Sequence, residues 1–360
     1  MSSIPQLAFG LSATKPYTSE QLSQMRAIVL ANAPYDKLLY RAANMPYREF
    51  VHRGPELMSI FDAADLLNIE AFVFAKDGNY TRSLECLQYG ASLATQSGPN
   101  SSVGVDPYPG FAEYLTNMGF AEEVLLNSRN LLIFAGPNKP VAKAVQRIVD
   151  ELSPDIDFKT AWIKESASFS QIFRKWRSVP VSKLGDDMQQ TLGHEGQVSD
   201  DITPTPSEKT LARAALDRAE SEYLDNAAAI LNGYAESTDR GEKVTNNVES
   251  KLGSLKDASS PTSITVLLQY EPLRIMHIGM KRRTAEALIT KAAAYALEIK
   301  AASGKYPSSL PANLLGHTLN VTIHYSCVGD SQITISSIVQ YSKDELKINR
   351  PTVKDFVYKQ

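Results

Sequence analysis

The strongest constraint on the fold is a long amphipathic run from Lys281 to Ser303, which ends at Gly304-Lys305-Tyr306-Pro307. Apolar residues recur there in alternating steps of three and four, which places them on one stripe of an α-helix. They are Ala285, Leu288, Ala292, Tyr295, Ile299 and Ala302. Gly304 can adopt the left-handed conformation that ends a helix, and Pro307 prevents the helix from resuming. We therefore predict a long helix that stops at Gly304, with Tyr306 and Pro307 as structural residues of its end.

The charge of the chain gives no reason to expect a nucleic-acid partner. Its net charge is −3, and 43% of its 360 residues are hydrophobic, which is ordinary globular composition. Lys281-Arg282-Arg283 is an isolated basic run, and we interpret it as a solvated helix face. No apolar run is long enough to span a bilayer, and the first residues lack the pattern of a signal peptide.

The residues that usually hold metals or cofactors do not form a recognisable set. Two cysteines, Cys86 and Cys327, are too few for a disulfide scaffold or a structural zinc site, and we expect two free thiols. The five histidines lack paired ligand spacing, and no glycine-rich phosphate loop or nucleophile elbow occurs. His277 lies in an apolar stretch and is interpreted as a core histidine. We expect no metal and no cofactor.

The first third of the chain predicts paired helices. A helix begins near Thr18-Ser19 and meets a boundary at Ala33-Pro34, after which a second short helix follows. Residues 57–96 then predict a helical hairpin, because two apolar stripes flank a turn at Asp77-Gly78-Asn79. Gly78 and Tyr80 are its structural residues.

Two further patterns complete the predicted fold. Residues 318–325 and 332–339 alternate with period two around a turn at 328–331, which predicts an antiparallel hairpin, and 353–358 could add a third strand. We expect a mainly α protein, an irregular multi-helix bundle with a small C-terminal antiparallel β-hairpin. The predicted regions are 1–183 (helical), 184–206 (mobile polar linker or insertion), 207–311 (long helices) and 312–360 (β appendage).

One helix contains both tryptophans and the best candidate for a catalytic group. Trp162 and Trp176 lie on a stripe with Phe169 and Phe173, so this helix is expected to anchor a core. Glu165 falls on or beside that stripe. A half-buried carboxylate there could have a raised pKa and act as a general acid or base, but we prefer a structural ion pair.

Two segments of the chain resemble a group of uncharacterised bacterial proteins. The first runs from Ala31-Asn32-Ala33-Pro34 through Met45-Pro46-Tyr47-Arg48 to the turn at Gly78-Asn79-Tyr80. The second is the helix end Ala302-Ser303-Gly304-Lys305-Tyr306-Pro307 with the strand pair after it. The resemblance implies a helical body held outside the cytoplasm by an N-terminal membrane helix. It therefore implies an anchor before Met1 and an extracytoplasmic location; without an anchor the location would be cytoplasmic.

The Gly304–Pro307 ending also resembles the segment that follows the long helix of the major pseudopilins. That resemblance covers about twenty residues and is restricted to the motif. From the helical architecture, the lack of catalytic motifs and the first resemblance, we expect a non-enzymatic interaction or scaffold domain of the cell envelope with a protein or envelope-polymer partner. Its binding groove is expected near the 97–110 loop or the 185–206 insertion. The alternatives are a hydrolase built around Glu165 and a pseudopilus-type assembly component.

Overall fold

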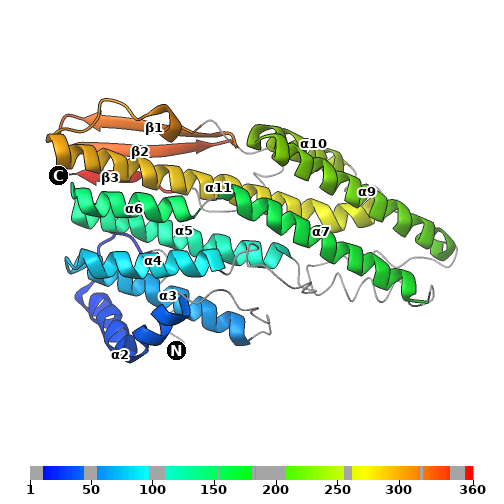
Figure 1. Cartoon of the computed structure of the whole chain (residues 1–360), viewed down its shortest axis with the longest axis horizontal. Coiled ribbons are helices and arrows are strands. Elements are labelled where there is room, and N and C mark those ends of the chain that lie inside the picture. Colours follow the sequence, from blue (N-terminus) through cyan, green and yellow to red (C-terminus); the bar gives the residue numbers. More distant parts are fainter. Residues whose placement is uncertain are drawn as a thin grey trace. The chain divides into compact units, whose positions relative to one another are not determined.

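The protein is mainly α-helical, with a three-stranded antiparallel sheet near its C-terminus (Figure 1). A computed structural model describes residues 11–43, 55–96, 110–152, 154–180, 183, 208–254, 262–316, 319–340 and 353–359. The predicted fold class is confirmed. The predicted 184–206 insertion and the 97–110 loop, apart from Gly110, lie outside the described residues.

The chain forms two compact units that are interleaved along the sequence. The first comprises Met1–Gly104, Glu113–Phe158 and Ile278–Gln360, and the second comprises Val105–Ala112 and Lys159–His277. The regions predicted from the sequence are continuous segments, whereas each unit combines segments that are separate in the sequence. The reason is that helices distant in sequence share one core.

The first unit begins with helix α2 (Ser19–Ala43) and the hairpin of α3 (Pro55–Lys76) and α4 (Tyr80–Gln96). The predicted hairpin is confirmed: Gly78 adopts a φ of +79° in its turn, which glycine tolerates without strain. The hydroxyl of Tyr80 donates to the carbonyl of Phe134 at 3.0 Å and so ties α4 to α5 (Gly110–Ala135). Helix α6 (Lys139–Glu151) follows, capped by the side chain of Asn138.

Helix α2 corrects one prediction from the sequence. The expected boundary at Ala33-Pro34 is wrong, because the helix continues through Pro34 as a single element of 25 residues. A proline inside a helix removes the hydrogen bond to the carbonyl four residues earlier. That carbonyl belongs to Leu30, which lies at the surface, where water can replace the missing donor.

Helix α11 (Thr262–Ser303) contains the amphipathic run and begins well before it, because the helix also continues across Pro272. Its predicted stop is confirmed, since Gly304 has a φ of +76°. Tyr306 is buried beneath the Lys300 ammonium, which lies 5.0 Å from the ring centre. The carbonyl of Pro307 accepts a hydrogen bond from Tyr325 at 2.8 Å, so the end of the helix is tied to the sheet.

The sheet consists of β1 (Val321–Val328), β2 (Gln332–Val339) and β3 (Phe356–Lys359) in that order. Both pairings are antiparallel, so the predicted hairpin and third strand are confirmed. Val321, Ile323, Ile333, Ile335 and Phe356 are buried, whereas Ile338, opposite Thr322, lies on the other face and is exposed.

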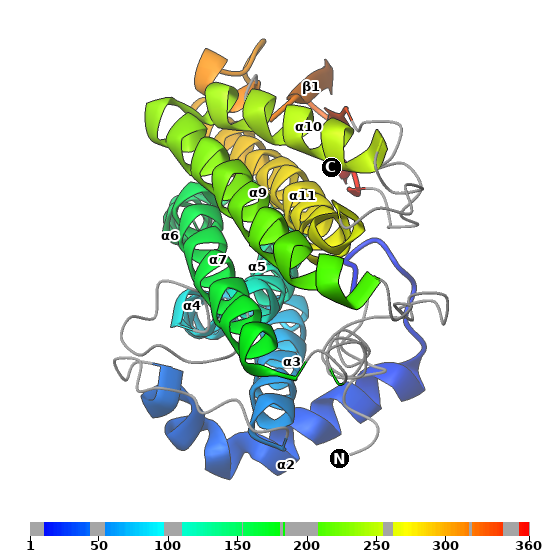
Figure 2. The ribbon, with the colours of Figure 1, turned by 90° about the vertical axis from the view of Figure 1, so that its right-hand side faces the viewer.

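The second unit is built from α7 (Pro154–Ser178, within the unit from Lys159), α9 (Glu208–Glu236), α10 (Thr238–Ser254) and the start of α11. Helices α9 and α10 lie side by side (Figure 2). The predicted aromatic stripe of α7 is confirmed, because Trp162, Phe169, Phe173 and Trp176 are all buried. Tyr223 of α9 packs against three of them, with ring centres 5.2–6.5 Å apart.

Candidate functional site

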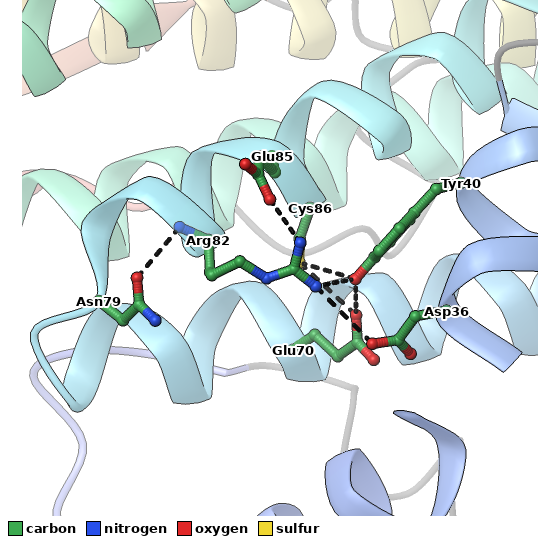
Figure 3. Close-up of polar contacts among 7 residues, drawn as sticks. All are labelled: Asp36, Tyr40, Glu70, Asn79, Arg82, Glu85 and Cys86. Carbon is green, nitrogen blue, oxygen red and sulfur yellow. Dashed lines mark hydrogen bonds and ion pairs between the residues drawn. The ribbon is translucent and has the colours of Figure 1, made fainter. Parts of the chain in front are cut away.

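A group of ionisable side chains in mutual contact lies where α2 meets the α3–α4 hairpin (Figure 3). We call it the acid–tyrosine cluster; its members are Asp36, Tyr40, Glu70, Arg82, Glu85 and Cys86. Asp36 and Tyr40 are four residues apart on α2, and so are Arg82 and Cys86 on α4. Residues at this spacing share one face of a helix, so both pairs point toward Glu70 of α3.

A chain of hydrogen bonds leads through the cluster to one oxygen of Glu70. Arg82 Nη2 donates to the hydroxyl of Tyr40 at 2.9 Å, and this hydroxyl donates to Glu70 Oε2 at 3.0 Å. The thiol of Cys86 donates to the same oxygen at 3.5 Å. Arg82 also forms ion pairs with Asp36, at 3.7 Å, and with Glu85. The cluster therefore connects three helices through their side chains.

Burial determines the protonation of this cluster. Glu70 is 0% exposed, and burial together with the charge of Asp36 and a hydrogen bond with Asp36 raises the pKa of Glu70 to about 7. Glu70 thus exchanges its proton near neutral pH instead of near the ordinary 4.5.

Cys86 and Tyr40 remain neutral beside this carboxyl. Burial, followed by the charge of Glu70, raises the pKa of the Cys86 thiol, and burial likewise raises the pKa of Tyr40. A thiol held in its protonated form is a poor nucleophile. The Tyr40 ring stacks on Tyr89 with 4.3 Å between centres. This arrangement suits the cluster to holding α2 on the hairpin more than to attacking a substrate.

A second polar group links α3 and α5 in the same unit. Asn68 donates to Glu123, Asn127 donates to Asn68 at 3.1 Å, and Asn130 donates to Asn127 at 3.1 Å. Asn130 also accepts from the backbone N–H of Ala13 at 2.8 Å, which fixes the residues before α2. Burial and the charge of Asp65 raise the pKa of Glu123 to about 7. Two carboxyls of this unit therefore titrate in the same range.

The basic run of α11 corrects another expectation. Lys281-Arg282-Arg283 is not a solvated face, because Lys281 and Arg283 are buried within the first unit. Arg283 Nη1 donates to Asn117 Oδ1 at 2.5 Å, Arg282 pairs with Glu122 at 3.0 Å, and Lys281 donates to the carbonyl of Gln340 at 3.4 Å. Each cation has a polar partner, which the buried Lys281 and Arg283 require.

The structure places Glu165 deeper than expected. Glu165 of α7 is 1% exposed, whereas the sequence predicted a half-buried carboxylate. Burial, and next the charge of Glu165, raise the pKa of Tyr223. The carboxylate that meets His277 is Glu249, at 3.1 Å from Nδ1, and both residues are buried. The interpretation of His277 as a core histidine is confirmed; the ion pair expected for Glu165 stays a prediction.

Sequence reasoning missed the acid–tyrosine cluster, although a signal for it was present. The pairs Asp36–Tyr40 and Arg82–Cys86 each have the spacing of one helix turn. The spacing within α2 and α4 could not predict that Glu70 of α3 completes the cluster, because Glu70 lies in an apolar stripe of α3. Of the residues predicted to be structural, Trp162 and Trp176 lie in the core of the second unit, and Gly78, Tyr80, Gly304, Tyr306 and Pro307 lie at turns and ends of helices in the first.

The comparisons with known proteins add no relative. Neither the protein-family models, nor the curated proteins, nor the solved structures contain a match to this chain. Within the described ranges, no group of three or more His, Cys, Asp or Glu side chains could hold a metal ion. Among the helices that the structure describes, none is both long and apolar enough to cross a membrane.

Proposed function

We propose that this chain is a non-enzymatic helical interaction domain of the bacterial cell envelope that binds another protein through α2. The observation that carries the proposal is the outer face of α2, where Leu30 is 78% exposed and Tyr35 is 61% exposed. The outer face consists of exposed residues of both kinds: Ala27, Leu30, Ala31, Pro34 and Tyr35 in its middle, and Glu20, Ser23, Gln24, Lys37 and Arg41 toward its ends.

The sequence of α2 explains why apolar groups remain at the surface. From Ala27 to Tyr35 the helix contains no charged residue. Its inner side packs Met25, Ile28 and Val29 against the core formed with Ile69 and Phe72. Apolar residues therefore occur all round this stretch, as in helices that are covered on every side. A partner over the outer face would provide the missing cover.

The side chains that could act as acids, bases or nucleophiles are buried, which supports binding over catalysis. Glu70, Cys86, Glu165 and His277 are all buried. A general acid or a nucleophile must come within hydrogen-bonding or bonding distance of its substrate. A hydrolase site at Glu165 would have to open before a substrate could reach this carboxyl. The envelope location rests on the resemblance of residues 31–80 and 302–307 to extracytoplasmic proteins.

Photocrosslinking in living cells tests the proposal. A chain in which benzoylphenylalanine replaces Leu30 should form a protein adduct, and Tyr35→Asp in the same chain should abolish it. The matched control places the same probe at Ile338, a comparably exposed apolar residue on the sheet, where we expect no adduct. An adduct at 338 and none at 30, or an adduct that survives Tyr35→Asp, would refute binding through α2.

A further inference from the structure

We infer that the partner on the outer face of α2 is the same helix of a second copy of this chain, packed antiparallel to form a two-fold symmetric dimer. The inference rests on the proposed function and names its partner. It is argued from the order of charged and apolar residues along this face.

Four residues of the outer face recur every seven positions, namely Glu20, Ala27, Pro34 and Arg41. A spacing of seven keeps residues on one line along a helix, which is the pattern that two packed helices share. The line is symmetric about a point between Leu30 and Ala31. An antiparallel copy centred on that point places Ala27 opposite Pro34 and Leu30 opposite Ala31.

The charges at the two ends of the line complement each other in this arrangement. Glu20 begins the line and Arg41 ends it, so an antiparallel copy places each Glu20 opposite the partner's Arg41. Within the described residues, neither side chain has an ion-pair partner of its own. Lys37, which is also exposed, lies level with Gln24 of the second copy and adds positive charge at the same end. A parallel copy would instead place like charges together.

The size of this face sets the expected strength of the dimer. A helix of 25 residues is about 37 Å long, so pairing along α2 alone covers on the order of 400 Å² on each copy. Stable complexes bury about 800 Å² on each partner, so we expect a weak, concentration-dependent dimer. Leu30 and Tyr35 lie on either side of the central line and supply the apolar contacts that flank it.

Analytical ultracentrifugation of the whole chain over a range of concentrations tests the inference. The mass of wild type should rise from 39.5 kDa toward twice that value. Leu30→Asp and, independently, Tyr35→Asp should stay monomeric at every concentration, with the helical circular dichroism of wild type. Ile338→Asp is the matched control and should dimerise like wild type, because this exposed residue lies on the sheet.

Charge reversal tests the antiparallel register. Glu20→Arg alone and Arg41→Glu alone should each weaken the dimer roughly tenfold, and the double variant should restore it. Each single change also disturbs the favourable interaction of a charge with its own helix end. If that effect dominated, the double variant would be the weakest of the three, and the register would be refuted. A wild type that is monomeric at all concentrations would refute the dimer.

The crosslinked adduct separates this inference from the proposed function. An adduct from position 30 with twice the mass of the chain supports the dimer. An adduct of the chain with a different protein would refute the second copy while leaving binding through α2 intact. No adduct at position 30 would refute both.

Discussion

Two regions of this protein hold their helices together by different means. In the second unit, the aromatic core of Trp162, Phe169, Phe173, Trp176 and Tyr223 joins α7 to α9 through large buried rings. In the first unit, the acid–tyrosine cluster joins α2 to the hairpin through hydrogen bonds that end on Glu70. The aromatic core does not depend on a proton, whereas the cluster does. Stability should therefore respond to side-chain volume in one region and to pH in the other.

The largest expected effect is in the aromatic core. Trp162→Ala should lower the free energy of unfolding by about 3–5 kcal/mol, because it removes a fully buried ring and leaves a cavity. The measurement is denaturant unfolding followed by circular dichroism. The adjacent Ile163 is 55% exposed and provides the control, since Ile163→Ala should change stability by less than about 0.5 kcal/mol. Equal losses from the two variants would mean that the tryptophan stripe does not anchor this unit.

The second effect depends on pH and belongs to the acid–tyrosine cluster. Because the pKa of Glu70 is raised from 4.5 to about 7, the folded state binds this proton more tightly than the unfolded chain. The stabilisation is complete below pH 4.5 and is lost as the pH rises toward 7. A shift of this size corresponds to on the order of 3 kcal/mol, at about 1.4 kcal/mol for each pKa unit. Glu70→Gln should remove that part of the decline, as measured by unfolding at pH 4.5, 6 and 7.5.

A second carboxyl sharpens this test. The pKa of Glu123 is also raised to about 7, so wild type should lose stability from both groups over the same pH range. Glu70→Gln should therefore leave a residual decline that Glu70→Gln with Glu123→Gln removes. If Glu70→Gln had the same pH dependence as wild type, Glu70 would be charged in the fold, and burial would not control its proton.

The same contrast explains what the sequence could predict. The aromatic stripe, the hairpin turn at Gly78 and the stop at Gly304 were predicted correctly, because each is encoded by neighbours within one or two turns of the chain. The sequence predicted a helix boundary at Pro34, but α2 continues through it. The general effect of proline on helices does not show whether the carbonyl that loses its donor can bind water instead. The burial of Lys281 and Arg283 was missed because the partners of this basic run, Gln340, Glu122 and Asn117, come from distant segments.

The candidate sites were harder to predict than the fold. Glu165 was recognised as an unusual carboxylate, but its depth depends on how α9 packs over α7. The acid–tyrosine cluster is formed by side chains from three helices. In the sequence Glu70 is a single polar residue within an apolar stripe, so nothing near it indicates the cluster. A raised pKa arises from burial and neighbouring charges, which exist only after the helices have packed.

The smallest expected effect isolates one hydrogen bond of the cluster. Tyr40→Phe keeps the ring that stacks on Tyr89 but removes the hydroxyl that donates to Glu70 and accepts from Arg82. The expected loss is about 1 kcal/mol at pH 5, where Glu70 holds its proton, measured by denaturant unfolding. Tyr35→Phe is the matched control on the same helix: its exposed hydroxyl should contribute less than about 0.5 kcal/mol.

At pH 7.5 the loss for Tyr40→Phe should be larger than at pH 5, because a hydroxyl that donates to an ionised carboxylate stabilises it more than one that donates to a neutral acid. A loss that is the same at both pH values would mean that Tyr40 does not respond to the proton on Glu70. The contact between α2 and the hairpin would then depend on packing alone, as in the aromatic core.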